Sequence, residues 1–149
     1  MKKLFFLFTA LLLISCSSDD DASLENENGF LTVYEDVVFL QETTLDGYTS
    51  SFWLIFSPAG VTEGDNEEGV YCDTDFYPWN VEVDGETYKV IQNSPNTLKV
   101  RYTYVDTEYP EDNEDEEFTL SVSDNILTIS ANGESNTLYK APSAPCNWA

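Results

Sequence analysis

Apolar and polar residues alternate along most of the chain beyond residue 78, and this period of two predicts β-strands. In the segment 98–104, for example, the even positions are Leu, Val, Tyr and Tyr, while the odd positions carry Lys, Arg and Thr. Turn dipeptides such as Asp84-Gly85 separate these segments and predict tight hairpins. The strands expected from this pattern cover 79–83, 88–92, 98–104, 118–122, 126–129 and 137–140.

The first half of the chain shows the same tendency less regularly. Residues 30–40 are rich in β-branched and aromatic side chains and predict a strand with a bend at Glu35-Asp36. Residues 48–56 include five successive apolar side chains, as expected of a strand buried on both faces or of an apolar helical turn. The acidic segments 63–69 and 107–117 predict loops, with a brief strand at 70–72 between them.

Eight or nine strands at intervals of about ten residues describe an all-β fold built as an antiparallel meander. Outside the first residues, no segment sustains the i, i+3, i+4, i+7 spacing of an amphipathic helix. Such a meander forms either a barrel or a β-sandwich. We prefer a barrel because eight strands suffice to close a sheet on itself.

The N-terminus has the three parts of a secretory signal peptide. Lys2 and Lys3 precede an almost wholly apolar segment, 4–14, which is too short for the roughly 20 residues of a membrane span. The following Leu13-Ile14-Ser15-Cys16 resembles a bacterial lipobox, in which the cysteine is lipidated and becomes the new N-terminus. We expect residues 1–15 to be removed and Cys16 to carry the lipid that anchors the protein to a membrane.

Ser17-Ser18-Asp19-Asp20-Asp21 resembles the acidic tag that directs some Gram-negative lipoproteins to the outer face of the outer membrane. The alternative is a solvated linker with incidental charge. Residues 16–28 contain little to bury and predict a lipidated, flexible, acidic tether. Residues 29–149 then form a single β domain, a length that suits one core.

Charge and cysteine content indicate which partners the protein is expected to have and how its cysteines are expected to pair. The chain has 28 acidic and 6 basic residues, a formal charge of −22 that disfavours binding to nucleic acid. We expect contact with the membrane through the lipid only. Cys72 and Cys146 are expected to pair in an oxidising compartment, with two free buried thiols as the alternative.

Signals for catalysis are weak, and we expect no enzyme, no cofactor and no metal site. Histidine is absent, which excludes Ser-His-Asp and Cys-His arrangements. A calcium loop needs a mid-loop glycine and alternating oxygen ligands, but the segment 107–117 has no glycine and the segment 63–69 lacks the alternating spacing, so solvated loops are the simpler interpretation. Lys99 and Arg101 are expected to pair with acids on neighbouring strands.

The tryptophans divide into core and peripheral candidates. We expect Trp53 in the core, because it lies in the most apolar segment of the chain. Trp79 and Tyr77 flank Pro78 where a strand begins and could lie at a rim. Trp148 follows Cys146 and is expected to pack where a disulfide holds the tail.

With the strands placed, residues 79–140 resemble the later half of bacterial lipocalin-like lipoprotein domains. The similarity lies in Trp79-x-Val81, in the Asn-Thr-Leu-x-Val segment 96–100 and in the Asp-Asn-x-Leu-Thr-Ile hairpin 124–129. Gly29-Phe30-Leu31 replaces the Gly-x-Trp strand that usually opens the family. The resemblance implies a lipocalin-like β domain.

These features favour a surface-exposed outer-membrane lipoprotein that acts as a non-catalytic binder of a small or hydrophobic ligand. The alternative is a structural or accessory subunit that docks on an outer-membrane protein complex and has no small-molecule ligand. An enlarged apolar lumen would favour the first function, whereas a solid core with an exposed apolar patch would favour the second.

Overall fold

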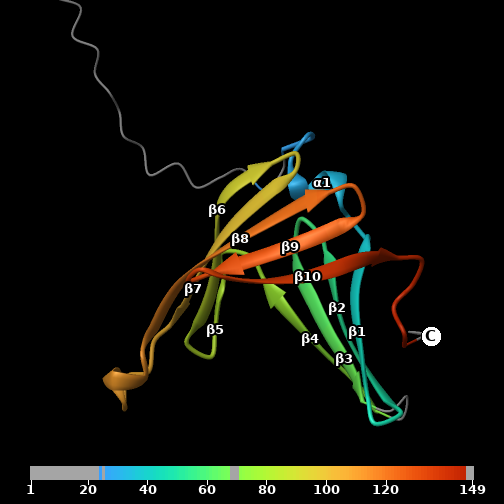
Figure 1. The fold of residues 1–149 in the computed structure, drawn as a ribbon. Helices are drawn as coiled ribbons and strands as arrows, with labels where there is room; N and C mark the ends of the chain where they lie inside the picture. Colours follow the sequence, from blue (N-terminus) through green and yellow to red (C-terminus); the bar gives the residue numbers. More distant parts are fainter. Residues whose placement is uncertain (1–23, 25, 68–70, 147–149) are drawn as a thin grey trace, which may run out of the picture.

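The computed structural model describes residues 24, 26–67 and 71–146 (Figure 1). Within these residues, ten strands, one short α-helix and one 3-10 helix follow one another along the chain. The helices are α1 (Phe30–Val33) and η1 (Pro110–Asp112). The strands are β1 (Val38–Leu45), β2 (Tyr48–Phe56), β3 (Gly60–Glu67), β4 (Tyr71–Pro78), β5 (Glu82–Val83), β6 (Glu86–Ser94), β7 (Thr97–Tyr104), β8 (Glu114–Ser123), β9 (Ile126–Ala131) and β10 (Glu134–Ala141).

All ten strands of the described chain belong to one antiparallel sheet in the order β4-β3-β2-β1-β10-β9-β8-β7-β6-β5. The all-β meander predicted from the sequence is therefore confirmed, with one or two strands more than expected. The sheet curls into a half-barrel, and its two edges, β4 and β5–β6, come together just after the end of β4. There Trp79 forms a bridge with Tyr88, while the strands diverge below into two legs (Figure 1).

Hairpin turns lie where the sequence predicts them. Asp84, Asp124 and Asn132 adopt positive φ angles of 51°, 57° and 50°, the left-handed conformation that Asp and Asn tolerate best among non-glycine residues. Gly85 and Gly133 follow with φ angles of 88° and 85°, as a type I′ turn requires. These turns fix the register of the neighbouring strands.

The two acidic segments expected to be loops are partly strands, so that prediction is wrong for them. β3 runs through Glu67, and β8 already begins at Glu114. β3 hydrogen-bonds β2 on one side and β4 on the other, and β8 lies between β7 and β9. Backbone pairing with two neighbours overrides the low strand propensity of these acidic residues.

The strand expected at 30–40 is also wrong in its first part. Residues Phe30–Val33 form α1, and β1 begins only at Val38. The predicted bend coincides with Asp36, whose φ of 59° separates the two elements. Similarly, only Glu82–Val83 of the segment expected at 79–83 is a strand, because Asn80 has a φ of 58°.

The core lies at the closed end of the half-barrel, where α1 packs between the curved strands (Figure 1). Phe30 and Leu31 of α1 have no exposed surface. The same holds for side chains from several strands, namely Phe39, Val90, Leu98, Leu127 and Leu138. A side chain without accessible surface has no neighbouring space that could hold a water molecule, so the core at this end is solid.

Within the described residues, no helix combines the length and the apolar character that crossing a bilayer demands.

Candidate functional site

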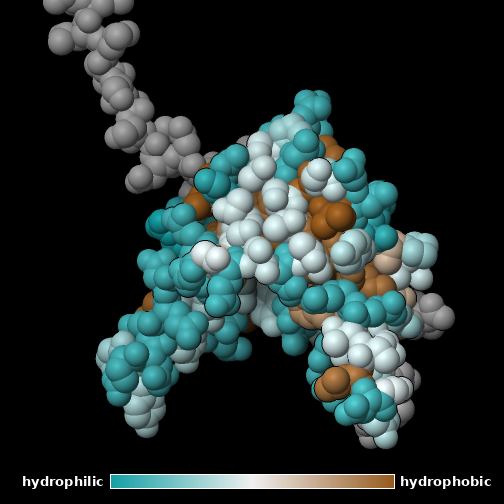
Figure 2. Space-filling view, viewed as in Figure 1, coloured by the Kyte–Doolittle hydropathy of each residue, from teal (hydrophilic) through white to brown (hydrophobic). Residues whose placement is uncertain are grey.

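The concave face of the sheet changes from apolar to acidic toward the open end. On this face Leu54, a core residue, lies opposite Glu63 of β3, and Glu63 lies opposite Asp75 of β4. Residues paired across neighbouring strands share one face of a sheet. The two carboxylates therefore point toward the inside of the half-barrel, below the core. Figure 2 shows the opening between the legs, whose surface is mostly hydrophilic on the side of β7 and β8.

Three tyrosines form a row across the seam where the two sheet edges meet. The ring centroids of Tyr77 and Tyr88 are 5.0 Å apart, as are those of Tyr88 and Tyr102. Tyr77 belongs to β4, whereas Tyr88 and Tyr102 belong to β6 and β7. The Tyr102 hydroxyl donates a hydrogen bond to Glu86 Oε1 at 3.2 Å. The row therefore joins opposite edges of the sheet and fixes one carboxylate beside the rings.

Below this contact, a pocket of about 290 Å³ opens between β4 and the β5–β6 hairpin; we call it the seam pocket. Its lining combines three carboxylates with aromatic and aliphatic side chains, and it contains no Lys or Arg. The residues that line it are Asp75, Phe76, Tyr77, Pro78, Val81, Val83, Asp84, Glu86 and Tyr88. Such a mixture of apolar walls and a few polar groups is typical of small-molecule sites.

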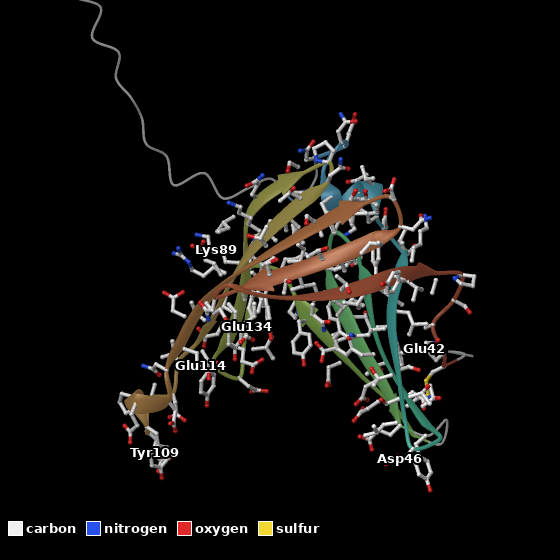
Figure 3. All side chains as sticks on the ribbon, in the orientation of Figure 1. Glu42, Asp46, Lys89, Tyr109, Glu114 and Glu134 are labelled. Carbon is white, nitrogen blue, oxygen red and sulfur yellow. A yellow bond between two sulfur atoms is a disulfide. The ribbon has the colours of Figure 1, made fainter. Side chains whose placement is uncertain are left out.

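A second, more polar pocket of about 450 Å³ adjoins it through Glu86 and is lined also by Tyr102, Tyr104 and residues 111–114. Figure 3 labels Glu114 on this leg and Tyr109 near its tip, with Asp46 at the tip of the opposite leg. The sticks in that view lie along the inner sides of both legs and leave a gap between them.

Burial and the neighbouring acidic residues raise the pKa values of the three tyrosines. Burial, with the charges of Glu63, Asp75 and Glu86, raises the pKa of Tyr77. Burial and Glu86 also raise the pKa of Tyr88, and they raise that of Tyr102 to about 12. All three phenols stay neutral at physiological pH, so they present ring faces and hydroxyl donors within a field of negative charge.

Burial raises the pKa of Glu63, and the charges of Asp75 and Asp65 raise it further. A carboxyl whose pKa is higher in the folded state than the usual 4.5 is destabilising once it ionises. We expect Glu63→Gln to raise the melting temperature at pH 7 relative to the wild type. The difference should grow as the pH rises through 4.5 and the raised pKa, and vanish below them. Thermal unfolding of both proteins from pH 4 to pH 8 measures it, and equal profiles would contradict a buried charge at Glu63.

The acidic loop before β8 is organised by its own hydrogen bonds. Asp106 accepts hydrogen bonds from the backbone N–H groups of Glu108 and Tyr109 at 2.7 and 2.9 Å, which lower its pKa. The Tyr104 hydroxyl also donates to Asp106, at 3.2 Å. In the part of the chain that the structure describes, no three or more Asp, Glu or Cys side chains are grouped to hold a metal ion.

Of the predicted site residues, Cys72 and Cys146 are joined by a disulfide, which confirms the expected pairing. Their Cα atoms are 6.3 Å apart, within the usual range. The Asn66 side-chain amide donates to both sulfur atoms, at 3.4 and 3.6 Å. Cys16 and Trp148 lie outside the described residues, as do the signal peptide and the acidic tag.

Trp53 is buried, as expected, with no exposed surface. By strand alternation it faces away from Leu54 and Phe56, so it lies on the convex face of β2. Its ring covers Gly64 of β3, where a Cβ atom would overlap it. Trp79, expected as a rim candidate with Tyr77, is instead only 5% exposed, and its indole N–H donates to the Ser57 carbonyl at 2.9 Å.

Arg101 forms the cross-strand pairs expected of it. Its guanidinium contacts Glu117 and lies 3.7 Å from Asp115, both on β8. Lys99 lies on the same face of β7, two residues earlier. These pairs are exposed, so solvent and salt screen them and they contribute little to stability. They face away from the tyrosine row, which uses the alternate positions of β7.

The seam pocket was not predicted from the sequence. Tyr88 and Tyr102 occupy inward positions of adjacent strands, and the alternating pattern could have indicated that they share a face. Tyr77 joins them only because the sheet curls until its two ends touch, which no local pattern records. A scan of protein-family models and searches of curated proteins and of solved structures found no match to this chain.

Proposed function

We propose that this chain is a lipid-anchored, non-catalytic binding protein on the surface of the outer membrane, and that the seam pocket is its ligand site. The lipobox-like Cys16 and the acidic residues after it support the location. The mixed aromatic, aliphatic and carboxylate lining of the seam pocket supports the binding role.

The observation that carries the proposal is the position of the tether relative to the pocket. Asn26 donates a side-chain hydrogen bond to the Asn93 carbonyl at 2.9 Å, and Asn93 donates to the Leu24 carbonyl at 3.4 Å. The chain thus enters the domain at the Asn93 end of β6, whereas Glu86 lines the pocket at the other end. Seven residues of extended strand separate them by about 23 Å. An anchor at Cys16 would therefore hold the domain by the end of β6 opposite the pocket.

The solid core determines where a ligand can lie. The side chains at the closed end have no accessible surface, which leaves no room there for a hydrophobic ligand of the lipocalin type. The proposed ligand is therefore small and binds at the seam, in contact with water, instead of inside an apolar lumen.

Lipid attachment is tested with Cys16→Ser. We expect the variant to remain an unprocessed precursor and to lose partition into the detergent phase, because the thiol is the acylation site. Metabolic labelling with palmitate should mark the wild type only. Labelling of the variant, or an unlabelled wild type, would contradict the anchor.

Surface display is tested with Asp19→Ala, Asp20→Ala and Asp21→Ala combined. This variant should keep its lipid but become resistant to protease added to intact cells. Both proteins should be equally sensitive in lysed cells, which controls for a change in folding. Equal sensitivity in intact cells would mean that the acidic residues are only a linker.

A docking subunit is the second candidate. The solid core and the exposed apolar side chains at the seam favour it, whereas the seam pocket favours the binding role. β4 is an edge strand, and Phe76, Val81 and Val83 near it are about half exposed. Edge strands with exposed apolar side chains are potential interaction surfaces. Cross-linking in intact cells through a photoreactive residue at Phe76 would favour this function if it captured one outer-membrane protein in stoichiometric amounts.

A further inference from the structure

We propose that the seam pocket binds an organic ammonium group carried on a compact apolar body. This inference rests on the proposed function, in which the pocket is a ligand site, and specifies the ligand's chemical class. Three features of the pocket support the inference: its aromatic walls, the sign of its charge and its volume.

The walls suit an apolar cation. Tyr77 and Tyr88 line the pocket from opposite edges of the sheet, with ring centroids 5.0 Å apart and planes inclined at 49°. The faces of aromatic rings attract alkylated ammonium groups, as they do in aromatic cages. Pro78, Val81 and Val83 supply aliphatic contacts that a hydrated metal ion could not use.

The charge in the pocket has a single sign. Asp75, Asp84 and Glu86 line it, and the Glu63 carboxylate is close enough to raise the pKa of both Tyr77 and Tyr88. The basic residue closest in sequence on β6, Lys89, alternates with Tyr88 and so points to the convex face, as its label in Figure 3 shows. These carboxylates would repel an anionic ligand, and a neutral ligand would leave their negative charge unbalanced.

The volume limits the size of the ligand. At about 290 Å³, the pocket lies at the lower end of the range for small-molecule sites. A trimethylammonium or similar head with a short chain fits this space better than a long polyamine. Charged side chains at the edge of a sheet prevent its pairing with another chain, and this role would explain Asp75 and Asp84. It does not explain the apolar side chains that line the pocket beside them.

The experiment compares choline with 3,3-dimethylbutan-1-ol, its uncharged isostere, on the mature lipidated protein in a maltoside detergent. Binding is followed by calorimetry in 0.15 M NaCl. We expect choline to bind at least tenfold more tightly than the alcohol, because only choline satisfies both the ring faces and the carboxylates. Equal affinities, or no binding of choline up to 50 mM, would overturn the proposal.

Variants locate the site and separate it from diffuse attraction to an acidic protein. Glu86→Gln should weaken choline binding at least threefold and Tyr88→Leu at least tenfold, while Asp46→Asn, at the tip of the other leg, should not change it. Circular dichroism shows whether each variant folds. If Tyr88→Leu does not fold, Glu86→Gln still tests the site. Equal losses in all three variants, or equal binding of spermidine, would mean non-specific attraction and contradict the proposal.

The two proposals fail in different ways. A protein that is lipidated and displayed but ignores choline would disprove the ammonium site and leave the location intact. A protein that binds choline but carries no lipid would do the reverse.

Discussion

Replacing Cys72 or Cys146 with serine should lower the free energy of unfolding by about 2–4 kcal/mol. The disulfide closes a loop with a sequence separation of 74, for which the chain-entropy model gives roughly 4 kcal/mol as an upper value. It ties the segment that follows β10 to the edge strand β4, which otherwise pairs with β3 alone. A loss of this size is a large part of the 5–15 kcal/mol by which domains are usually stable.

Denaturant unfolding of both single variants and of the double variant measures this effect. The single variants should be equally destabilised and the double variant little more, because each one breaks the same bond. Adding a reductant to the wild type should reproduce the loss, and the variants should not respond to it. Two alkylatable thiols in the exported wild type would contradict the disulfide in the native protein.

The disulfide also bears on the seam pocket, since Cys72 and Tyr77 lie on the same edge strand. When β4 loses its tie to the C-terminal segment, its contact with β6 depends on the Tyr77–Tyr88 pair and on the Trp79 bridge. The redox state of the protein should therefore be fixed before any ligand affinity is compared.

The sequence predicted the parts of the fold that depend on neighbours in the chain. The alternation at 98–104 gave both the strand and its two faces, because successive side chains point to opposite sides. Asp84-Gly85 gave the hairpin, because both positions require positive φ. The cysteine pairing followed from there being two candidates besides the lipobox cysteine, without any knowledge of geometry.

The remainder depends on contacts between distant parts of the chain. β3 contains Glu63, Gly64 and Asp65 and has no strand pattern of its own, yet β2 and β4 pair with it along its whole length. The seam pocket forms because the curvature of ten strands brings β4 to β6, and curvature is a property of the entire sheet. Phe30 and Leu31 lie in a helix instead of the expected strand. Their apolar character could not predict this, because it is equally compatible with a strand and with a buried helical turn.

Phe30→Ala should cost about 3–5 kcal/mol of stability, the usual loss when a buried aromatic ring is removed. The Phe30 ring has no exposed surface and lies 4.8 Å from the ring of Tyr34 and 5.2 Å from that of Phe56. α1 has four residues and no side-chain cap, so it has no stability of its own. Its place depends on packing, and the variant should lose both the ring contacts and the helical turn that covers the closed end.

Val33→Ala is the matched control, because Val33 belongs to the same helix but is 48% exposed. It changes the helix without opening a cavity and should alter stability by less than about 0.5 kcal/mol. Denaturant unfolding of both variants separates the two contributions. A loss below about 1 kcal/mol for Phe30→Ala would mean that α1 is dispensable and that the strands close over the core without it. A loss of about 3–5 kcal/mol would mean that the Phe30 ring packs in the core, where α1 covers an end that the curled sheet leaves open.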